Sequence, residues 1–303
     1  MRPLAWSVAA LLAVLLALAI VVHVLAERRL DRIYPMPANL PEADPALLEE
    51  GRQLASSRGC ADCHGDDFAG RVLADEMPFA RLVGSNLTGM RGGHAYRNVH
   101  ERMQLALRHG LGPDARPLLM MPSTSFNSLS AREVEALAAF FATLPPVRRE
   151  LPDSELGPLG RALLVGGKLE GFVSAESIDH RRPAVARPPP LGTVHYGRHA
   201  AQLCSGCHGS DFGGRRSSHG GPQAPPAANL TPDPTGLAGW TEADFVHAMR
   251  TGRRPDGSEI DAKAMPWRAI GTASDEELRS IWLFLAQLPP VQRDVAGAPA
   301  KAR

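Results

Sequence analysis

The sequence predicts an all-α protein in which one membrane-spanning helix precedes two tandem copies of a small helical domain. Three observations support this fold class. The chain begins with an uncharged apolar stretch from Leu4 to Ala26. The pattern CADCHGDDFAG, from Cys60 to Gly70, returns as CSGCHGSDFGG from Cys204 to Gly214, and an internal repeat of this kind defines the architecture. Helix signals are frequent along the chain, whereas strand signals are sparse.

Length and composition are compatible with two small domains. The chain has 303 residues, of which 44% are hydrophobic and 21% charged, an ordinary balance for globular domains. The formal net charge is +1, so no strongly basic surface indicates a nucleic-acid partner. All four cysteines lie inside the two copies of the repeated pattern. These copies therefore carry the chemistry of the chain.

The apolar stretch Leu4–Ala26 is long enough to cross a bilayer, which takes about 20 residues. We interpret it as an uncleaved signal anchor. The alternative is a cleaved signal peptide, with Val24-Leu25-Ala26 as a small-residue cleavage site, but signal h-regions usually run to only about 7–15 residues. Arginines on both sides, Arg2 before the stretch and Arg28 and Arg29 after it, leave its orientation undecided by the positive-inside rule.

The repeat extends far beyond the cysteines. Asn86-Leu87-Thr88 matches Asn229-Leu230-Thr231, and Met121-Pro122 matches Met265-Pro266. The distance in sequence from His64 to Met121 equals the distance from His208 to Met265, although the loops between them differ in length. This equality indicates a methionine held at a fixed place relative to the histidine in each copy.

Helix signals divide the chain into segments. Capping boxes open apolar-periodic runs at Ser130 and Ser274, and each run stops at a Pro-Pro pair. A further helix is predicted to open at Trp240–Asp244 and to end at Gly252, and helices over 45–57 and 195–203 precede the cysteine clusters. Residues 151–190 contain a short helical pattern near 156–164 and a proline-rich, extended end. The predicted segments are the anchor 1–30, domain 31–150, linker 151–190 and domain 191–303.

Cys-x-x-Cys-His is the attachment signature of c-type haem. The two thiols add across the porphyrin vinyl groups, and one helical turn presents both sulfurs along one haem edge. The adjacent histidine then faces the iron. Cys60, Cys63 and His64 form the first set, and Cys204, Cys207 and His208 form the second. The sequence therefore predicts two covalently bound haem c groups.

Other uses of the four cysteines fit the pattern less well. A structural zinc site takes Cys-x-x-Cys pairs, but the wide separation of the pairs and the histidine after each argue against it. A thioredoxin-like redox pair is expected beside a strand–helix unit. A disulfide suits an exported protein, yet a bridge within Cys-x-x-Cys closes almost no loop. Haem attachment is the interpretation that accounts for both histidines.

With these motifs, each half resembles a class I cytochrome c domain, and the whole chain resembles membrane-anchored dihaem cytochromes c of periplasmic dehydrogenases. The resemblance covers about residues 40–150 and 190–295. It implies small helical folds wrapped around one haem each, with histidine and usually methionine as axial ligands. It also implies attachment of the haem outside the bacterial inner membrane. A single-pass inner-membrane protein with its domains in the periplasm is therefore expected.

The resemblance implies a second axial ligand downstream in each half. Met265, in Ala-Met-Pro-Trp, matches the Met-Pro pattern of the family. In the first half Met120 and Met121 are adjacent, and register with the following helix favours Met121. Met/His ligation raises the iron potential. Six other histidines do not recur in the two halves and are interpreted as surface or supporting residues: His94, His100, His109, His199, His219 and His247.

Some flanking residues are given weaker roles. Gly65 and Gly209 are expected to let the backbone turn close to the porphyrin. The Asn-Leu-Thr turns either cap a loop or approach a propionate. Arg71, Arg215 and Arg216 either pair with propionates or lie in solvent.

The expected function is electron transfer between redox partner proteins: a dehydrogenase or other donor on one side, and an oxidase or small cytochrome of the respiratory chain on the other. A catalyst is less expected than a carrier. The enzymatic alternative is a dihaem peroxidase, which requires one iron with an open position and a nearby acid–base group. A third possibility is an assembly subunit whose haems mainly stabilise the fold, distinguished by haem loss without loss of electron flux.

Overall fold

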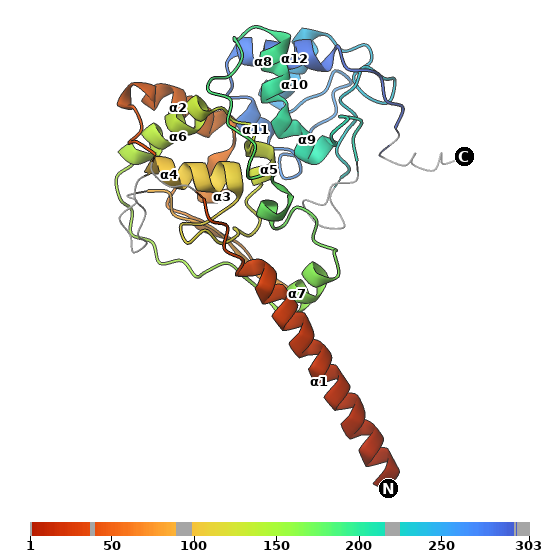
Figure 1. Cartoon of the computed structure of the whole chain (residues 1–303). Helices are drawn as coiled ribbons and strands as arrows, with labels where there is room; N and C mark the ends of the chain where they lie inside the picture. The colour runs from red at the N-terminus through yellow and green to blue at the C-terminus, as the bar shows by residue number, and fades with distance from the viewer. Residues whose placement is uncertain (1, 37–39, 89–98, 216–224, 294, 296–303) are drawn as a thin grey trace, which may run out of the picture.

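The computed structural model describes residues 2–36, 40–88, 99–215, 225–293 and 295, and these residues are predominantly helical with few strands. Figure 1 shows a body of short helices from which one long helix, α1, extends. The elements, in chain order, are α1 (Arg2–Leu30), η1 (Pro45–Leu47), α2 (Leu48–Ser57), α3 (Cys60–His64), β1 (Arg71–Glu76), β2 (Ala80–Gly84), α4 (Val99–Met103), η2 (Gln104–His109), α5 (Ser123–Phe126), α6 (Ala131–Thr143), β3 (Glu155–Leu156), α7 (Pro158–Val165), η3 (Ser174–Ser177), α8 (Val194–Ala200), α9 (Gln202–His208), α10 (Glu242–Thr251), α11 (Trp267–Ile270) and α12 (Asp275–Leu285).

Helix α1 is the element predicted from the apolar N-terminal stretch. The candidate span Trp6–Leu30 has 25 residues and contains an 18-residue stretch with a mean hydropathy of 3.0. By length and composition this helix can cross a membrane. Its side chains from Trp6 to Val21 are exposed along the whole free length, which Figure 1 shows projecting from the body.

The core of the N-terminal half lies between α2 and α6. Helix α6 begins with the predicted capping box, in which the Ser130 hydroxyl accepts from the Glu133 N–H and the Glu133 carboxylate accepts from the Ser130 N–H. The two helices approach closely at Gly51, where a Cβ would overlap the carbonyl oxygen of Ala136. Leu137 and Phe141 are almost fully buried beneath this crossing. Glycine is therefore required at Gly51 to let the two backbones meet.

The C-terminal half repeats this crossing with α8 and α12. A Cβ at Gly197 would overlap the carbonyl oxygen of Ser280, and Leu278 and Leu285 are buried beneath the contact. Helix α10 opens with a capping box between Thr241 and Asp244 and ends before Gly252, as predicted. The predicted helix 195–203 is divided between α8 and α9, which meet at Ala201.

A small antiparallel sheet, not predicted from the sequence, qualifies the expectation of an all-α protein. Strands β1 and β2 pair in a hairpin, and β3 adds to the far edge of β2. The third strand and α7 come from residues 151–190, which the sequence suggested to be a linker. Their side chains Leu156 and Leu164 pack in one buried cluster with Ala80 and Leu82. Such pairing of distant segments gives no local sequence signal, so short-range pattern could not reveal it.

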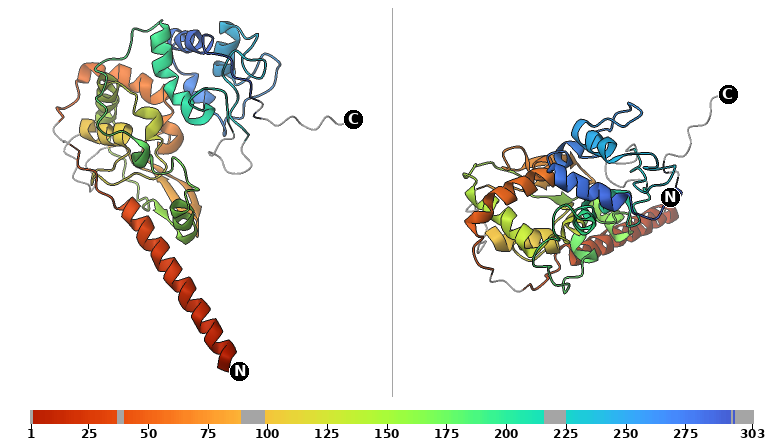
Figure 2. Two further views of the ribbon diagram at one scale, coloured as in Figure 1. Left: turned by 45° about the vertical axis from the view of Figure 1, so that its right-hand side comes forward. Right: turned by 90° about the horizontal axis from the view of Figure 1, so that it is seen from above.

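The two halves contact each other through buried charges. Arg58 of the first half donates to Glu277 of the second at 2.7 Å, and both side chains are 6% exposed. His199 of the second half lies 2.8 Å from the Glu133 carboxylate of the first. Helix α5 of the first half also packs against α9 of the second, and Figure 2 shows the two groups of helices side by side in both views. This contact brings the two cysteine motifs together.

Candidate functional site

Both Cys-x-x-Cys-His motifs form short helices that stop at a glycine. Helix α3 carries Cys60, Cys63 and His64, and it ends at Gly65, which has φ +82°. Helix α9 ends in the same way at Gly209, with φ +85°. Only glycine adopts such a conformation at low cost. The turn lets the chain leave each helix directly after the histidine, as the sequence predicted.

Each motif histidine is held by a backbone carbonyl. The Nδ1 atom of His64 lies 2.7 Å from the oxygen of Ser85, and Nδ1 of His208 lies 2.7 Å from the oxygen of Ala228. A carbonyl can only accept, so Nδ1 carries the proton and the lone pair of Nε2 is free for a metal. Burial lowers the pKa of both imidazoles. Both are therefore neutral near pH 7, as a ligand must be.

One continuous cavity of about 2860 Å³ connects the two motifs. Its lining includes all the residues predicted to bind haem: Cys60, Cys63, His64, Met121, Cys204, Cys207, His208 and Met265. Among the described residues that line it, His64 and His208 are the only histidines. The structure thus brings the eight predicted residues to one cavity shared by both halves.

The two adjacent methionines of the first half belong to different clusters. Met121 packs against the core that surrounds α2 and α6, whereas Met120 packs against the cluster formed by the sheet and α7. Met120 also has a positive φ of 62°, and both methionines line the large cavity. Met265 packs against the core of the second half. Met121 is therefore the counterpart of Met265 by environment as well as by register.

The motif thiols lie in apolar surroundings. Burial raises the pKa of Cys60 to about 12 and that of Cys204 to about 11. Arg58 opposes this rise at both thiols, so its guanidinium is near the first cysteine of each motif. Thiols with such high pKa values carry almost no thiolate at neutral pH, which is unlike a reactive redox pair.

The remaining histidines have partners away from the cavity. Nδ1 of His100 lies 3.0 Å from the oxygen of Pro41, and that of His109 lies 3.2 Å from His180. His199 contacts Glu133, and His247 is exposed. His94 and His219 lie outside the described residues, as does Arg216. Arg71 and Arg215 line the cavity, so their pairing with propionates stays a prediction.

Two arginines stabilise the loops that follow the motifs, and we did not predict them from the sequence. Arg149 donates to Asp67 and to the oxygen of Gly70, and Arg293 does the same to Asp211 and Gly214. The equal spacing of these arginines from their motifs could have revealed them.

The Asn-Leu-Thr turns hold the segment that follows the last helix of each half. The Asn86 amide donates to the Val147 oxygen, and the Thr88 hydroxyl accepts from the Val147 N–H. Asn229 and Thr231 bind Val291 in the same way. The sequence left two roles open for these turns, capping a loop or approaching a propionate. These contacts show that the turns hold a neighbouring loop.

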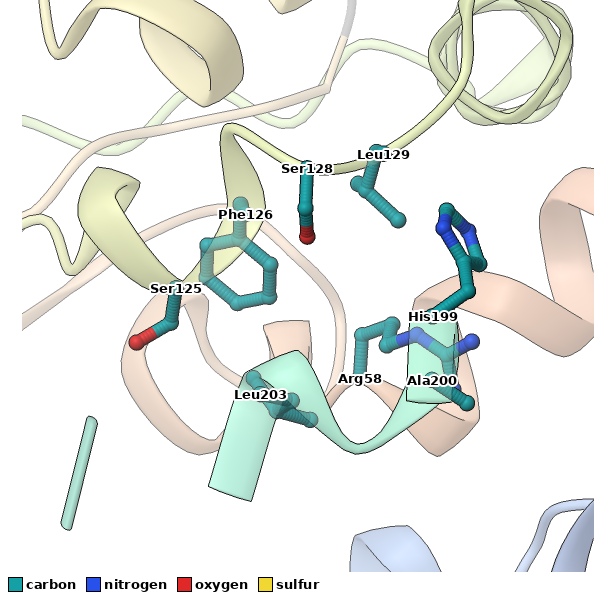
Figure 3. A pocket seen from close by; sticks show the side chains of 8 residues that line it. All are labelled: Arg58, Ser125, Phe126, Ser128, Leu129, His199, Ala200 and Leu203. Atoms are coloured by element: carbon teal, nitrogen blue, oxygen red, sulfur yellow. The ribbon is translucent and has the colours of Figure 1, made fainter. Parts of the chain in front are cut away.

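A much smaller cavity lies where the halves meet. Its volume, about 10 Å³, is close to the minimum needed for one water molecule. Figure 3 shows Arg58 and His199 on one side of it and Ser125, Phe126 and Ser128 on the other. The halves are thus packed closely around the buried charges.

Comparisons with known proteins agree with this geometry. The family model "Cytochrome c" matches residues 48–145. The chain is 28% identical to the cytochrome c subunit of alcohol dehydrogenase (quinone) of Gluconacetobacter polyoxogenes over 84% of its length, and 26% identical to the cytochrome subunit of fructose dehydrogenase of Gluconobacter japonicus over 72%. It spans 58% and 47%, respectively, of the length of these two relatives.

A third relative resembles the chain in length. The chain is 26% identical to a dihaem cytochrome c-type protein of Cereibacter sphaeroides, over 83% of the chain and 91% of the relative. A cytochrome c domain implies covalently bound haem c. Residues 48–145 thus match the cytochrome c family model, and the homologues of the chain include cytochrome c subunits of dehydrogenases and a dihaem cytochrome c.

Proposed function

We propose that the chain is a dihaem electron-transfer subunit, tethered to the bacterial inner membrane, that relays electrons from a periplasmic dehydrogenase to the respiratory chain. The observation that carries this proposal is the continuous cavity of about 2860 Å³, lined by both Cys-x-x-Cys-His motifs and both downstream methionines. A single cavity of this kind suits two cofactors held close together rather than one cofactor and a separate substrate.

The recurrence of contacts supports two tandem cytochrome c domains, over 31–150 and 191–303. Each half has the glycine crossing, the histidine anchored on a carbonyl, the arginine brace and the Asn-Leu-Thr turn. Phe68 and Phe212, which follow the two motifs, both have positive φ values, 54° and 57°, and pack edge-on against Phe140 and Phe284. Independent sequences would not reproduce this set by chance.

The residues present fit haem c at both motifs. Cys60, Cys63, Cys204 and Cys207 would carry the thioether bonds, and His64 and His208 would bind iron through Nε2. Met121 and Met265 would each supply a second ligand to the iron. Haem iron supplies a one-electron redox change when it is bound. The chain orients the imidazoles through the Ser85 and Ala228 carbonyls and excludes water with its apolar cores.

The membrane tether and the partner rest on α1 and on the relatives. Helix α1 is long and apolar enough to span a bilayer. Relatives named as dehydrogenase cytochrome subunits support a dehydrogenase as the donor. No comparison supports the alternative of a dihaem peroxidase.

The test is to count haems and identify ligands in the full chain. We expect mass spectrometry to show two haems, and the variants Cys60→Ser/Cys63→Ser and Cys204→Ser/Cys207→Ser to retain one each. In the oxidised protein, Met121→Ala and Met265→Ala are each expected to remove about half of the long-wavelength methionine–iron charge-transfer band, since Met/His ligation is expected at both sites. Met120→Ala is the matched control and is expected to leave the band unchanged.

Three results would contradict the proposal. A single haem in the parent chain would rule out a dihaem relay. If the Met121→Ala band were unchanged and the reduced parent protein bound carbon monoxide readily, the first iron would have an open position, and an enzyme would replace the electron carrier. Electron flux that persisted after haem loss would favour the assembly subunit.

A further inference from the structure

The last two turns of α1 are packed against the body rather than free. Side chains from Trp6 to Val21 are exposed, whereas Val22 is half-buried and Ala26 has no exposed surface. Leu30 packs into the cluster that contains Leu164 and the sheet residues Ala80 and Leu82. The last two turns of α1 therefore contact the body.

Helix α7 covers this part of α1. Arg161 donates to Glu27 at 2.8 Å, and Arg29 donates to the carbonyl oxygen of Leu164 at 2.6 Å. Arg29 also forms an ion pair with Glu176. Because later residues of α7 contact later residues of α1, the two helices run in the same direction. The first turn of α7 must then point back along α1, toward its apolar middle.

The first turn of α7 and the tip of the β1–β2 hairpin form one exposed apolar patch, here called the apolar tip and consisting of Met77, Pro78, Pro158 and Leu159. The N–H of Leu159 donates to the Pro78 oxygen at 3.1 Å, which joins the two segments. Met77 is 49% exposed and Leu159 is 50% exposed, and both prolines are exposed. Figure 2 shows the hairpin and α7 as the part of the body nearest the free length of α1.

The depth of the apolar tip follows from helix geometry. The hydrocarbon core of a bilayer takes about 20 helical residues, and the uncharged stretch of α1 ends at Ala26, just before the charged residues Glu27, Arg28 and Arg29. A span that starts at Trp6 therefore ends near Leu25. Arg161 is level with Glu27, and the first turn of α7 precedes Arg161 by about one turn, or about 5 Å of rise. The apolar tip thus lies level with the membrane boundary.

We propose that the apolar tip inserts into the interfacial region of the bilayer beside α1, so that the body docks on the lipid surface at two points. This inference rests on the proposed membrane tether. The partner is lipid itself, and the attraction is apolar. Beside the tip, Arg81 is paired with Asp75 and Glu155, so its charge is already neutralised and does not select anionic headgroups. Burial of exposed apolar surface is the remaining driving force.

Docking at two points fixes the orientation of the haem cavity. Because α1 is packed against α7, a single anchor helix would still let the body tilt together with α1, and the apolar tip adds a second point that limits this tilt. Here the sheet and α7 connect the apolar tip to the motif helix α3, which packs against β1 and β2. The cavity, whose lining also includes Arg29 and Leu30, is thereby held at a constant height above the membrane.

The experiment uses the full haem-loaded chain in vesicles of phosphatidylethanolamine and phosphatidylglycerol. With its native cysteines bound to haem, the chain accepts a single nitroxide label at an introduced cysteine. The labelled positions are Leu159→Cys in the apolar tip, Leu15→Cys in the span, and the matched control Leu191→Cys, an exposed leucine of the second half. Collision rates with oxygen and with a water-soluble nickel chelate report the surroundings of each label.

We expect the Leu159 label to lose collisions with the nickel chelate on transfer from detergent to vesicles, and the Leu191 label to keep them. The loss should be the same in vesicles of phosphatidylcholine alone, because the attraction is apolar. If the Leu159 and Leu191 labels behave alike while the Leu15 label is shielded from the chelate, the docking proposal is wrong and the tether stands. If the Leu15 label itself meets the chelate freely, the membrane tether fails, and docking beside it fails too.

Discussion

In the N-terminal half, the motif helix α3 packs against a two-stranded hairpin, β1 and β2, whereas the described residues after α9 in the C-terminal half form an isolated bridge between Arg215 and Ala227. The histidine anchors, glycine caps and arginine braces are nevertheless the same in both halves. In the first half these contacts are made by residues that lie outside the sheet. Its connection through α7 to α1 suggests that it serves the membrane side of the molecule.

The buried contact between the halves shows a second difference. Glu133 and Glu277 occupy equivalent places in the capping turns of α6 and α12, and each contacts a basic side chain from the opposite half. Glu277 takes Arg58, and Glu133 takes His199. An arginine cannot shed its charge in a protein, whereas a histidine can. The two equivalent glutamates are therefore expected to respond differently to mutation.

The largest expected effect is that of Glu277→Gln. Burial lowers the pKa of Arg58, but the charge and hydrogen bond of Glu277, together with Tyr196 and Glu133, raise it above its ordinary value, so Arg58 stays charged. Removing its buried partner is expected to lower the free energy of unfolding by about 3–5 kcal/mol. Glu133→Gln should cost less, about 1–3 kcal/mol, because His199 can become neutral. Denaturant titration of the holoprotein measures both.

The matched control is Glu242→Gln, because Glu242 forms an exposed pair with Arg279. Its loss should leave the free energy of unfolding almost unchanged, because exposed ion pairs contribute little to stability. Equal losses in the free energy of unfolding for Glu277→Gln and Glu133→Gln would contradict this prediction. They would show that stability does not depend on whether an arginine or a histidine contacts the glutamate.

The next effect concerns the helix crossings, where the halves should behave alike. Gly51→Ala and Gly197→Ala each drive a methyl group into a backbone carbonyl, which cannot move aside as a flexible side chain would. We expect each to lower the free energy of unfolding by about 3 kcal/mol, measured by thermal unfolding. Gly166→Ala, at φ −75° and with its nearest contact at 3.2 Å, is the control and should cost less. Clearly unequal costs for Gly51 and Gly197 would break the equivalence.

The motifs, the helix crossings and the buried contacts differ in how far the sequence alone predicts them. The motifs, capping boxes and methionine register depend on local spacing, so the sequence reveals them. Gly51 and Gly197 escaped notice because they lie at unequal distances from their motifs, nine residues before Cys60 and seven before Cys204. The addition of β3 to the sheet and the pairs Arg58–Glu277 and Glu133–His199 join residues far apart in the chain, and no local pattern encodes such contacts.

A smaller expected effect is a difference between the two halves in how their stability depends on pH. At the end of η2, burial, with help from His180 and Arg108, lowers the pKa of His109 from 6.5 to about 4. The equivalent place at the end of α10 holds Thr251, which does not titrate. Between pH 6.5 and about 4, unfolded His109 binds a proton that the folded form refuses, so stability falls as the pH falls. The contact of His109 with His180 should therefore loosen in this window.

Limited proteolysis across residues 173–180, followed over this pH interval, measures the loosening. Cleavage there should increase as the pH drops toward 4 in the parent chain and change much less in His109→Asn, whose amide does not titrate. Cleavage that is independent of pH in the parent would show that the histidine contact does not secure this segment.

The smallest expected effect concerns how the two methionine loops are braced. The Trp267 indole N–H donates to the Ile260 oxygen at 3.0 Å, whereas the equivalent Ser123 hydroxyl donates to the Ala106 oxygen at 2.7 Å. Each bond is worth about 1 kcal/mol, so Trp267→Phe and Ser123→Ala should barely change global stability. Because each bond holds only its own loop, each variant should weaken the methionine–iron band of one half, while the control Trp240→Phe leaves it intact. Each site is expected to give about half of the band. If either variant weakened the band by more than this share, the two methionine loops would be coupled through the cavity that both sites share. The two sites would then have to be treated as one redox unit.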